Sequence, residues 1–492
     1  MPEVHDVVIV GAGLGGIAAA IELTRHGIDD VILLDAADGV GGTWRYNDYP
    51  GAACDVPSHL YSYSFARRST WSRLCSPRQE ILDYVEKVAD VFGVAPLVRP
   101  NTRVTSCDWD DAAGHWIVRT EGAVFHAGAV VLATGQLNQP AYPSIEGLDS
   151  FAGHSFHSAR WDHDYDLTGK RVAVIGTGAS AVQFVPPVAE QVGRLSVFQR
   201  TGNWFMPRRN NVYPPLISAL FRLFPVLGSV WRLALFYYLE SLTAQIRHPR
   251  TFGHFGRIWS QLFMRMQLRD PETRRKVWPD YTFGCKRVLF SSAFLPALQR
   301  DNVDLVTEQI ARMTAKGPQT EDGRVHEVDC VIYGTGFRTT KFMFPMEITG
   351  IGGRTMREAW ADGPRAHLGI AVSGFPSLFV MYGPNTNTSG GSIIFFLEQQ
   401  ARYLRQAIQL ARRHDAAVDV RAEVMAASTD AVQDRFAGTA WLACQSWYRD
   451  ASGRIVTNWP GYMREYEKAT SRLDPAEFTL IERSPVAADQ GR

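Results

Sequence analysis

The sequence has little of three things: closely spaced cysteines, an excess of one charge, and long apolar runs. Its six cysteines form no Cys-x-x-Cys pair and no metal-type spacing, a pattern that predicts free thiols in a reducing cytoplasm and no bound metal. The 51 Lys and Arg residues nearly cancel the 50 Asp and Glu residues, so no strong field would attract nucleic acid. The expected partner is therefore a small molecule.

The most apolar stretch, residues 214–239, is divided by Arg222, Pro225 and Arg232. Its charge-free pieces fall short of the roughly 18 apolar residues that a membrane-spanning helix needs. We expect residues 216–246 to form helices that cover a hydrophobic cavity, and attachment to a membrane surface is the less favoured alternative. Strand-forming residues begin within the first ten positions, which leaves no room for a signal peptide and indicates a cytoplasmic protein.

A glycine-rich turn lies between an apolar stretch, residues 7–10, and a helix-forming stretch, residues 17–23. This order is typical of a dinucleotide-binding unit, in which a pyrophosphate rests against the N-terminus of the helix. The glycines permit the tight turn, the approach of the backbone to phosphate, and close packing of helix on strand. They are Gly11, Gly13 and Gly16. The next predicted strand, Val31 to Leu34, ends in Asp35, whose carboxylate suits a ribose hydroxyl of FAD or NAD.

A second unit repeats this order and ends differently. Residues 170–175 predict its first strand, and the turn is formed by Gly176, Gly178 and Ala181. The following strand, residues 195–199, finishes at Arg200 and Thr201 instead of an acid. A guanidinium there matches a ribose 2′-phosphate, which a carboxylate would repel. The second unit is therefore expected to prefer NADPH over NADH, and a chain that binds two dinucleotides is typically built to pass electrons between them.

The order of elements predicts how the domains are arranged. Apolar strands that end in small-residue turns close the two units at residues 130–135 and 331–336. We predict an α/β fold with two Rossmann-like domains, one for FAD and one for NADP, and a helical insertion in the NADP domain. The predicted FAD domain comprises residues 1–145 and 341–492, the NADP domain 150–210 and 285–340, and the insertion 211–284. A helix over Ile393 to Ala407 would direct its N-terminus at the flavin.

The segment that joins the units reads Phe-x-Gly-x-x-x-His-x-x-x-Trp-Asp over residues 151–162. It closely resembles the fingerprint of the type I Baeyer-Villiger monooxygenases, FAD enzymes that use NADPH and dioxygen to insert oxygen beside a ketone carbonyl. The N- and S-oxygenating relatives typically differ at the last two positions, so Trp161 and Asp162 favour the ketone-oxidising branch. Within this resemblance His157 is expected to be a hydrogen-bonded hinge residue more than a proton donor, and it and Trp161 to couple cofactor movement to catalysis.

The resemblance extends in order from residue 5 to about residue 465. It implies that Gly42, Thr43 and Trp44 contact FAD, that Lys286 reaches the 2′-phosphate of NADP beside Arg200, and that Trp447 closes over nicotinamide and substrate. The chain departs from the family pattern at two places. Asp35 stands where many members carry Glu, and Gly334 replaces the commoner Ala at the end of the second closing strand.

The resemblance also implies the chemistry. Reduced flavin would trap dioxygen as a C4a-peroxide that attacks a ketone and yields an ester or lactone, with sulfoxidation as a possible side activity. An anionic nucleophile and an anionic adduct both need a fixed positive charge. Arg287 is the candidate, because a guanidinium stays charged when it is buried. Asp55 would pair with Arg287, since an uncompensated buried Arg is very costly.

Three other functions share parts of this pattern. A disulfide reductase needs paired cysteines near the flavin, and only Cys54 lies between residues 40 and 60. An N- or S-oxygenating flavin monooxygenase and a flavin redox sensor without turnover stay open as alternatives. The predicted partners are a small-molecule ketone substrate and dioxygen, and the sequence does not define the oligomeric state.

Overall fold

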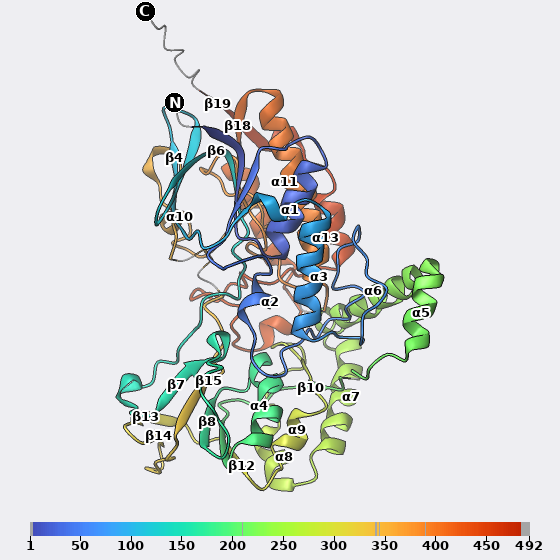
Figure 1. The fold of residues 1–492 in the computed structure, drawn as a ribbon, viewed down its shortest axis with the longest axis vertical. Helices are drawn as coiled ribbons and strands as arrows, with labels where there is room; N and C mark the ends of the chain where they lie inside the picture. The colour runs from blue at the N-terminus through green and yellow to red at the C-terminus, as the bar shows by residue number, and fades with distance from the viewer. Residues whose placement is uncertain (1–2, 209, 340–341, 344, 389, 484–492) are drawn as a thin grey trace, which may run out of the picture.

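Two mainly parallel sheets lie in separate bodies of the molecule, one above the other in Figure 1. The computed structural model describes residues 3–483 except 209, 340, 341, 344 and 389. The predicted boundary between residues 340 and 341 lies outside the described residues.

The upper body is built on a sheet in the order β16-β4-β5-β6-β1-β2-β3, with β17 paired to β6. The register of β1 places Val7 opposite Val31 on one side and Ala129 on the other, both in parallel ladders. Such central strands are buried on both faces, which explains their unbroken apolar sequences. The strands are β1 (Val4–Val10), β2 (Val31–Leu34), β3 (Val98–Arg99), β4 (Val104–Asp110), β5 (His115–Thr120), β6 (Val124–Leu132), β16 (Glu347–Thr349) and β17 (Leu378–Val380).

Helices from both ends of the chain pack on this sheet (Figure 1). They are α1 (Leu14–Thr24), α2 (Thr43–Tyr46), α3 (Arg78–Val91), α10 (Met356–Ala359), α11 (Ile393–Arg413), α12 (Ala422–Asp434) and α13 (Met463–Thr470), beside the antiparallel hairpin of β18 (Ala416–Val420) and β19 (Phe478–Glu482). The chain therefore returns to the first sheet after the second is complete.

The lower body has a parallel sheet in the order β12-β9-β8-β15-β7. Its elements are β7 (His154–His157), β8 (Arg171–Ile175), α4 (Ala179–Gln191), β9 (Arg194–Phe198), α9 (Phe294–Ala297), β12 (Val303–Val306) and β15 (Cys330–Tyr333), with the small pairs β10 (Phe205–Met206) with β11 (Leu289–Phe290) and β13 (Ile310–Thr314) with β14 (Gly317–Thr320). The joining segment contributes β7 itself, because His154 and His157 pair with Cys330 and Tyr333 at the sheet edge.

The inserted residues form α5 (Pro215–Leu223), α6 (Pro225–Arg247), α7 (Phe252–Gln267) and α8 (Pro271–Val277). In Figure 1, α5 and the first half of α6 project from the body as an arm. Among the described residues no single helix is long and apolar enough to cross a membrane; α5 and α6 together reach that length and composition but are bent by 109°.

The expectation that residues 216–246 cover a hydrophobic cavity gains no support from the packing of α5 and α6. Helix α5 has no buried residue, and the buried stripe of α6 includes Leu235 and Leu239, which pack in a filled cluster with Leu60 and Phe396. Side chains of α11 and α13 pack beneath α6, and most apolar side chains of the arm face outward.

Candidate functional site

A cavity of about 1530 Å³ opens to both glycine-rich turns. Of the sixteen catalytic and cofactor-binding residues predicted from the sequence, all but Gly16 and Ala181 line this cavity. The lining residues are Gly11, Gly13, Asp35, Gly42, Thr43, Trp44, Asp55, Gly176, Gly178, Arg200, Thr201, Lys286, Arg287 and Trp447. No residue of the fully described stretch 211–284 lines this cavity. The two units thus share one site, and the inserted helices lie outside it.

The first turn is too close to its neighbours for any side chain. Gly11 has φ of +106°, and a Cβ atom there would lie 2.6 Å from the carbonyl oxygen of Ala133. A Cβ on Gly16 would lie 1.9 Å from the carbonyl oxygen of Gly11. Gly13 begins α1 without a side-chain cap, so the free N–H groups of the first helical turn stand beside the cavity. This cradle fits a pyrophosphate.

Asp35 lies at the end of β2, as expected, and its carboxylate is largely buried. The Oδ2 atom accepts a hydrogen bond from the Ala12 N–H over 2.6 Å, and Oδ1 accepts one from the Ala37 N–H over 2.7 Å. The carboxylate therefore holds the first turn in place and keeps lone pairs free for a hydroxyl donor from the cavity.

The second glycine-rich turn has the geometry of the first, except that an alanine replaces the third glycine. Gly176 has φ of +107°, and a Cβ there would lie 2.5 Å from the carbonyl oxygen of Gly334. Ala181 occupies the third turn position, and a Cβ on Gly334 would lie only 3.2 Å from the Ala181 Cβ. Ala181 adds a methyl group where the first turn has a glycine, and Gly334 leaves room for it. This explains why Gly334 stands in place of the commoner Ala.

Arg200 and Lys286 form a cationic corner at the end of β9. The Lys286 ammonium lies 4.6 Å from the centre of the Tyr281 ring. Burial, and then the charge of Arg200, lower the pKa of Lys286. Two cations that disfavour each other in this way are stabilised by an arriving dianion, so the corner fits a phosphate group.

Arg287 donates a hydrogen bond from Nη2 to Oδ2 of Asp55 over 2.6 Å. Burial raises the pKa of the Asp55 carboxyl, but the charge and hydrogen bond of Arg287 outweigh burial and hold it below its ordinary value. The charge of Asp55 raises the pKa of Arg287 in turn. The Arg287 side chain is 34% exposed and lines the cavity, so the pair is anchored while it stays accessible from the cavity. It remains ionised across the physiological range.

The N-terminus of a helix and a segment at the rim complete the wall of the cavity. Helix α11 begins after Ser392 without a side-chain cap, and Gly391 and Ile393 line the cavity, so its N-terminal N–H groups point toward the site. Opposite, Gln445, Ser446 and Trp447 line the cavity, and the Trp447 side chain is 40% exposed. An exposed indole at the rim of an open cavity is available to cover a ligand.

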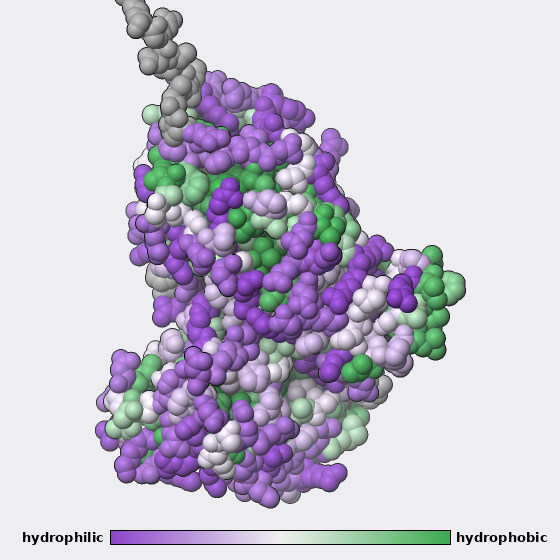
Figure 2. All heavy atoms as spheres, viewed as in Figure 1, coloured by the Kyte–Doolittle hydropathy of each residue, from purple (hydrophilic) through white to green (hydrophobic). Residues whose placement is uncertain are grey.

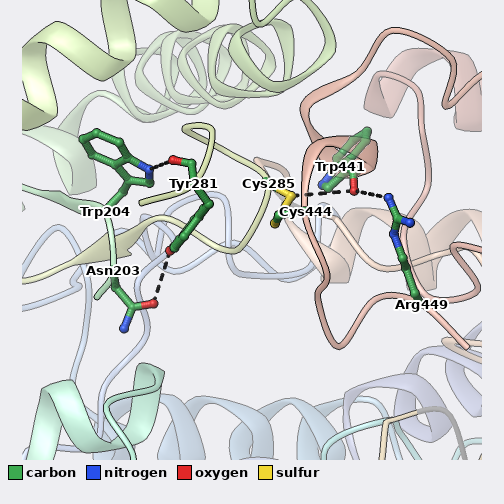
Figure 3. The surroundings of a disulfide bond; sticks show 7 residues. All are labelled: Asn203, Trp204, Tyr281, Cys285, Trp441, Cys444 and Arg449. Carbon is green, nitrogen blue, oxygen red and sulfur yellow. Dashed lines mark hydrogen bonds between the residues drawn. A yellow bond between two sulfur atoms is a disulfide. The ribbon is translucent and has the colours of Figure 1, made fainter. Parts of the chain in front are cut away.

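The expectation that all six cysteines are free is wrong, because Cys285 and Cys444 form a disulfide (Figure 3). The remaining four cysteines, Cys54, Cys75, Cys107 and Cys330, are free and buried. The bonded pair is 159 residues apart in sequence, so no local spacing reveals it. One signal was present: Cys285 directly precedes Lys286, and Cys444 lies three residues before Trp447. The disulfide therefore links the segment that carries Lys286 to the rim segment, which carries Trp447.

Residues that link the two bodies were also missed. Gln183 of α4 accepts hydrogen bonds from Tyr49 OH and the Ala53 N–H, and its amide donates to the Ala53 carbonyl over 2.9 Å. Arg208 donates to the carbonyl of Cys54 over 2.6 Å. Sequence spacing gives no sign of these contacts, since they exist only when the bodies are docked.

A second missed series runs from the second turn toward Lys286. Asn203 donates from its amide to the Thr177 carbonyl over 3.0 Å and accepts from Tyr281 OH over 3.4 Å (Figure 3). Tyr281 in turn lies against Lys286. The turn and the cationic corner are therefore held in one arrangement.

His157 ends β7 and is buried, with Nδ1 accepting a hydrogen bond from the Ala159 N–H over 3.1 Å. Burial lowers its pKa to about 4, so the ring is neutral at physiological pH. Trp161 packs against Phe156 and Phe184. Both residues have structural contacts, which favours the hinge role over proton donation.

A family described as pyridine nucleotide-disulphide oxidoreductase matches residues 8–218. A Baeyer-Villiger monooxygenase of Streptomyces coelicolor is 42% identical, over 98% of this chain and 95% of the relative. A steroid monooxygenase bound to NADP is 31% identical with a TM-score of 0.86, and an OTEMO complex with FAD and NADP is 28% identical with a TM-score of 0.88; each match covers 98% of this chain and 100% of the other.

Proposed function

The chain belongs to the Baeyer-Villiger monooxygenase family, and from this membership we propose that it converts ketones into esters or lactones. It is an NADPH-dependent flavoenzyme that takes a small-molecule substrate and dioxygen. The proposed ketone specificity depends chiefly on one observation: the ionised Arg287–Asp55 pair stands at the wall of the cavity that both glycine-rich turns share.

The two cofactors are assigned to the two turns by their charge. FAD would lie against the first turn, where the start of α1 and Asp35 offer N–H donors and a ribose acceptor. NADPH would lie against the second turn, with its 2′-phosphate between Arg200 and Lys286. When bound, NADPH supplies a hydride and the reduced flavin activates dioxygen for transfer to the substrate.

Arg287 is proposed to stabilise the negative charge that develops on the ketone oxygen as the carbonyl carbon becomes tetrahedral. A fixed guanidinium needs little reorganisation, and such preorganised donors contribute about 10²–10³ in rate. Asp55 orients the guanidinium through the 2.6 Å hydrogen bond and compensates its charge between turnovers. The pair therefore provides both orientation and a permanent cation.

Trp447 is proposed to close over the bound nicotinamide and substrate and exclude water. The rim segment is held by the Cys285–Cys444 disulfide and by Tyr448, whose side chain is buried. Water exclusion strengthens the effect of Arg287, because electrostatic stabilisation grows as the local dielectric falls.

Products distinguish the proposal from its alternatives. The purified yellow protein is incubated with NADPH in air and separately with cyclic ketones, aryl ketones, thioethers and tertiary amines, and the products are identified by mass. Ester or lactone formation is the expected result, with sulfoxide as a secondary product. N-oxide or sulfoxide without any ester would favour the N- or S-oxygenating alternative. NADPH oxidation that is independent of every substrate would favour the redox sensor.

A further inference from the structure

The arm exposes an unusual set of large apolar side chains. We define the arm patch as Leu216, Leu223, Phe224, Val226, Val230 and Leu233, whose exposed fractions run from 53% to 71%. Figure 2 shows hydrophobic residues gathered on the outer side of α5, at the tip of the projection. Single exposed apolar residues are ordinary on a protein surface, whereas a contiguous group on a projecting element marks an interaction site.

The charges around the arm patch have one sign. Residues 211–269, all of which the structure describes, contain seven arginines, no lysine and one acid, Glu240. Glu240 is half-buried, and its Oε1 accepts a hydrogen bond from the Met463 N–H over 2.8 Å. Arg222 is exposed within the patch, and Arg257 is exposed on α7. The arm therefore complements a negatively charged partner.

The aromatic side chains are also those of an interfacial element. Trp231 and Tyr237 of α6 are 37% and 47% exposed, and Phe255 and Trp259 of α7 are 71% and 50% exposed. Trp, Tyr and Phe beside Arg, on a helix with an apolar face, are typical of segments that lie in the boundary between lipid headgroups and acyl chains.

We propose that the arm docks on an anionic lipid surface, with α5 and the first half of α6 lying in the interface. The bend of 109° between α5 and α6 lets both helices present apolar residues without crossing the bilayer. Each arginine near an anionic surface contributes about a fivefold gain in binding.

A second copy of the chain is a poorer occupant. A twofold interface sets the same patch against itself, so Arg222 would approach the arginines of the partner with no exposed acid in residues 211–269 to pair with them. A lipid surface that carries phosphate headgroups meets both requirements of the patch, apolar cover and negative charge.

The test is sedimentation of the FAD-loaded protein with sucrose-filled vesicles, of phosphatidylcholine alone or mixed with phosphatidylglycerol. We expect binding to the mixed vesicles, weaker binding at high salt, and little binding to phosphatidylcholine alone. Leu223→Ser/Val226→Ser should lower the partition coefficient about a hundredfold, because each buried aliphatic side chain contributes roughly tenfold. The matched control, Val91→Ser/Val124→Ser, changes residues of similar exposure outside the arm and should bind like wild type.

Each outcome decides the proposal. Loss of vesicle binding in the arm variant, with ketone-dependent NADPH oxidation retained in solution, supports it. Absence of wild-type binding to phosphatidylglycerol vesicles overturns it, as does equal binding by the arm variant. A dimer in analytical ultracentrifugation that the arm variant abolishes would assign the patch to a second copy instead. Quenching of Trp231 fluorescence by brominated lipid, measured as the difference from Trp231→Phe, reports insertion of the first half of α6 independently of sedimentation.

Discussion

Arg287 and Asp55 are 232 residues apart in sequence, yet their side chains meet across 2.6 Å at the cavity wall. The carboxylate comes from the segment that follows α2 in the upper body, and the guanidinium comes from the segment that leads into β11 of the lower body. The pair therefore forms only when the two bodies are docked, and it makes the charge at the site depend on their relative position.

Arg287→Ala should leave the protein yellow and NADPH oxidation partly intact while ester formation disappears. Removal of one preorganised donor to developing charge costs about 10²–10³ in rate. The measurement compares ester formed per NADPH consumed. Arg287→Lys is the paired variant, which keeps a cation without the planar fork and should recover only part of the coupling. Ester formation by Arg287→Ala at a near wild-type rate would refute the catalytic assignment.

Arg200→Ala should weaken NADPH binding by about 1.5–3 kcal/mol and change NADH binding little, because a charge-assisted hydrogen bond to the 2′-phosphate is lost. Steady-state KM values for both nucleotides, together with the dissociation constants of NADP⁺ and NAD⁺, measure the difference. Arg194→Ala is the control, since Arg194 begins the same strand but pairs with Asp304. An equal loss for both nucleotides would show that Arg200 does not read the phosphate.

Cys444→Ser should lower the free energy of unfolding by about 2–5 kcal/mol, since the disulfide closes a long loop in the unfolded chain. Cys285→Ser and the double variant should give the same loss, because all three remove one bond. Chemical denaturation of the wild type with and without a dithiol reductant gives the reference. Two free thiols at Cys285 and Cys444, detected by alkylation and mass spectrometry of the air-oxidised protein, would contradict this pairing.

Stability should fall as the pH decreases from about 6.5 to about 4. Burial lowers the pKa of His59, His157 and His367 to about 4. In this window these histidines are protonated in the unfolded chain and neutral in the folded protein, so acid favours unfolding. Asp419 opposes part of this slope, because burial raises its pKa to about 6 and the folded protein takes up that proton first. Each histidine contributes at most about 1.4 kcal/mol per pH unit. Denaturant titrations at several pH values measure the slope, and His59→Phe should reduce it by at most about 1.4 kcal/mol per pH unit. An unchanged slope in that variant would show that His59 titrates normally.

The two glycine-rich turns could be predicted because their backbone conformation depends on local residue types. Gly11 and Gly176 each have a positive φ and lie close to a carbonyl oxygen, so only glycine fits there. The presence of glycine in the sequence therefore predicts the backbone conformation. The strands beside them are apolar because both faces of a parallel sheet are covered. The family membership, both cofactors and the two-domain α/β fold were accordingly correct, whereas the domain boundaries and the roles of the site residues stay predictions.

Contacts between residues far apart in the chain could not be predicted from the sequence. Gln183 and Arg208 bridge the bodies through backbone carbonyls, which any residue supplies, so no partner motif exists to search for. The arm could not be interpreted from the sequence for a related reason. An apolar helical face has the same periodicity whether it meets a core, a ligand or lipid, and only the structure shows that α6 packs on α11 and α13 while α5 buries none of its residues.

The exchange between Ala181 and Gly334 has a consequence for engineering. Each glycine-rich turn and the strand end facing it are a matched set, tuned to within a single methyl group. A graft that moves the second turn into the first unit, for example to alter nucleotide preference, would set the Ala181 methyl group against that of Ala133, which stands where Gly334 does, so the graft must carry this glycine along.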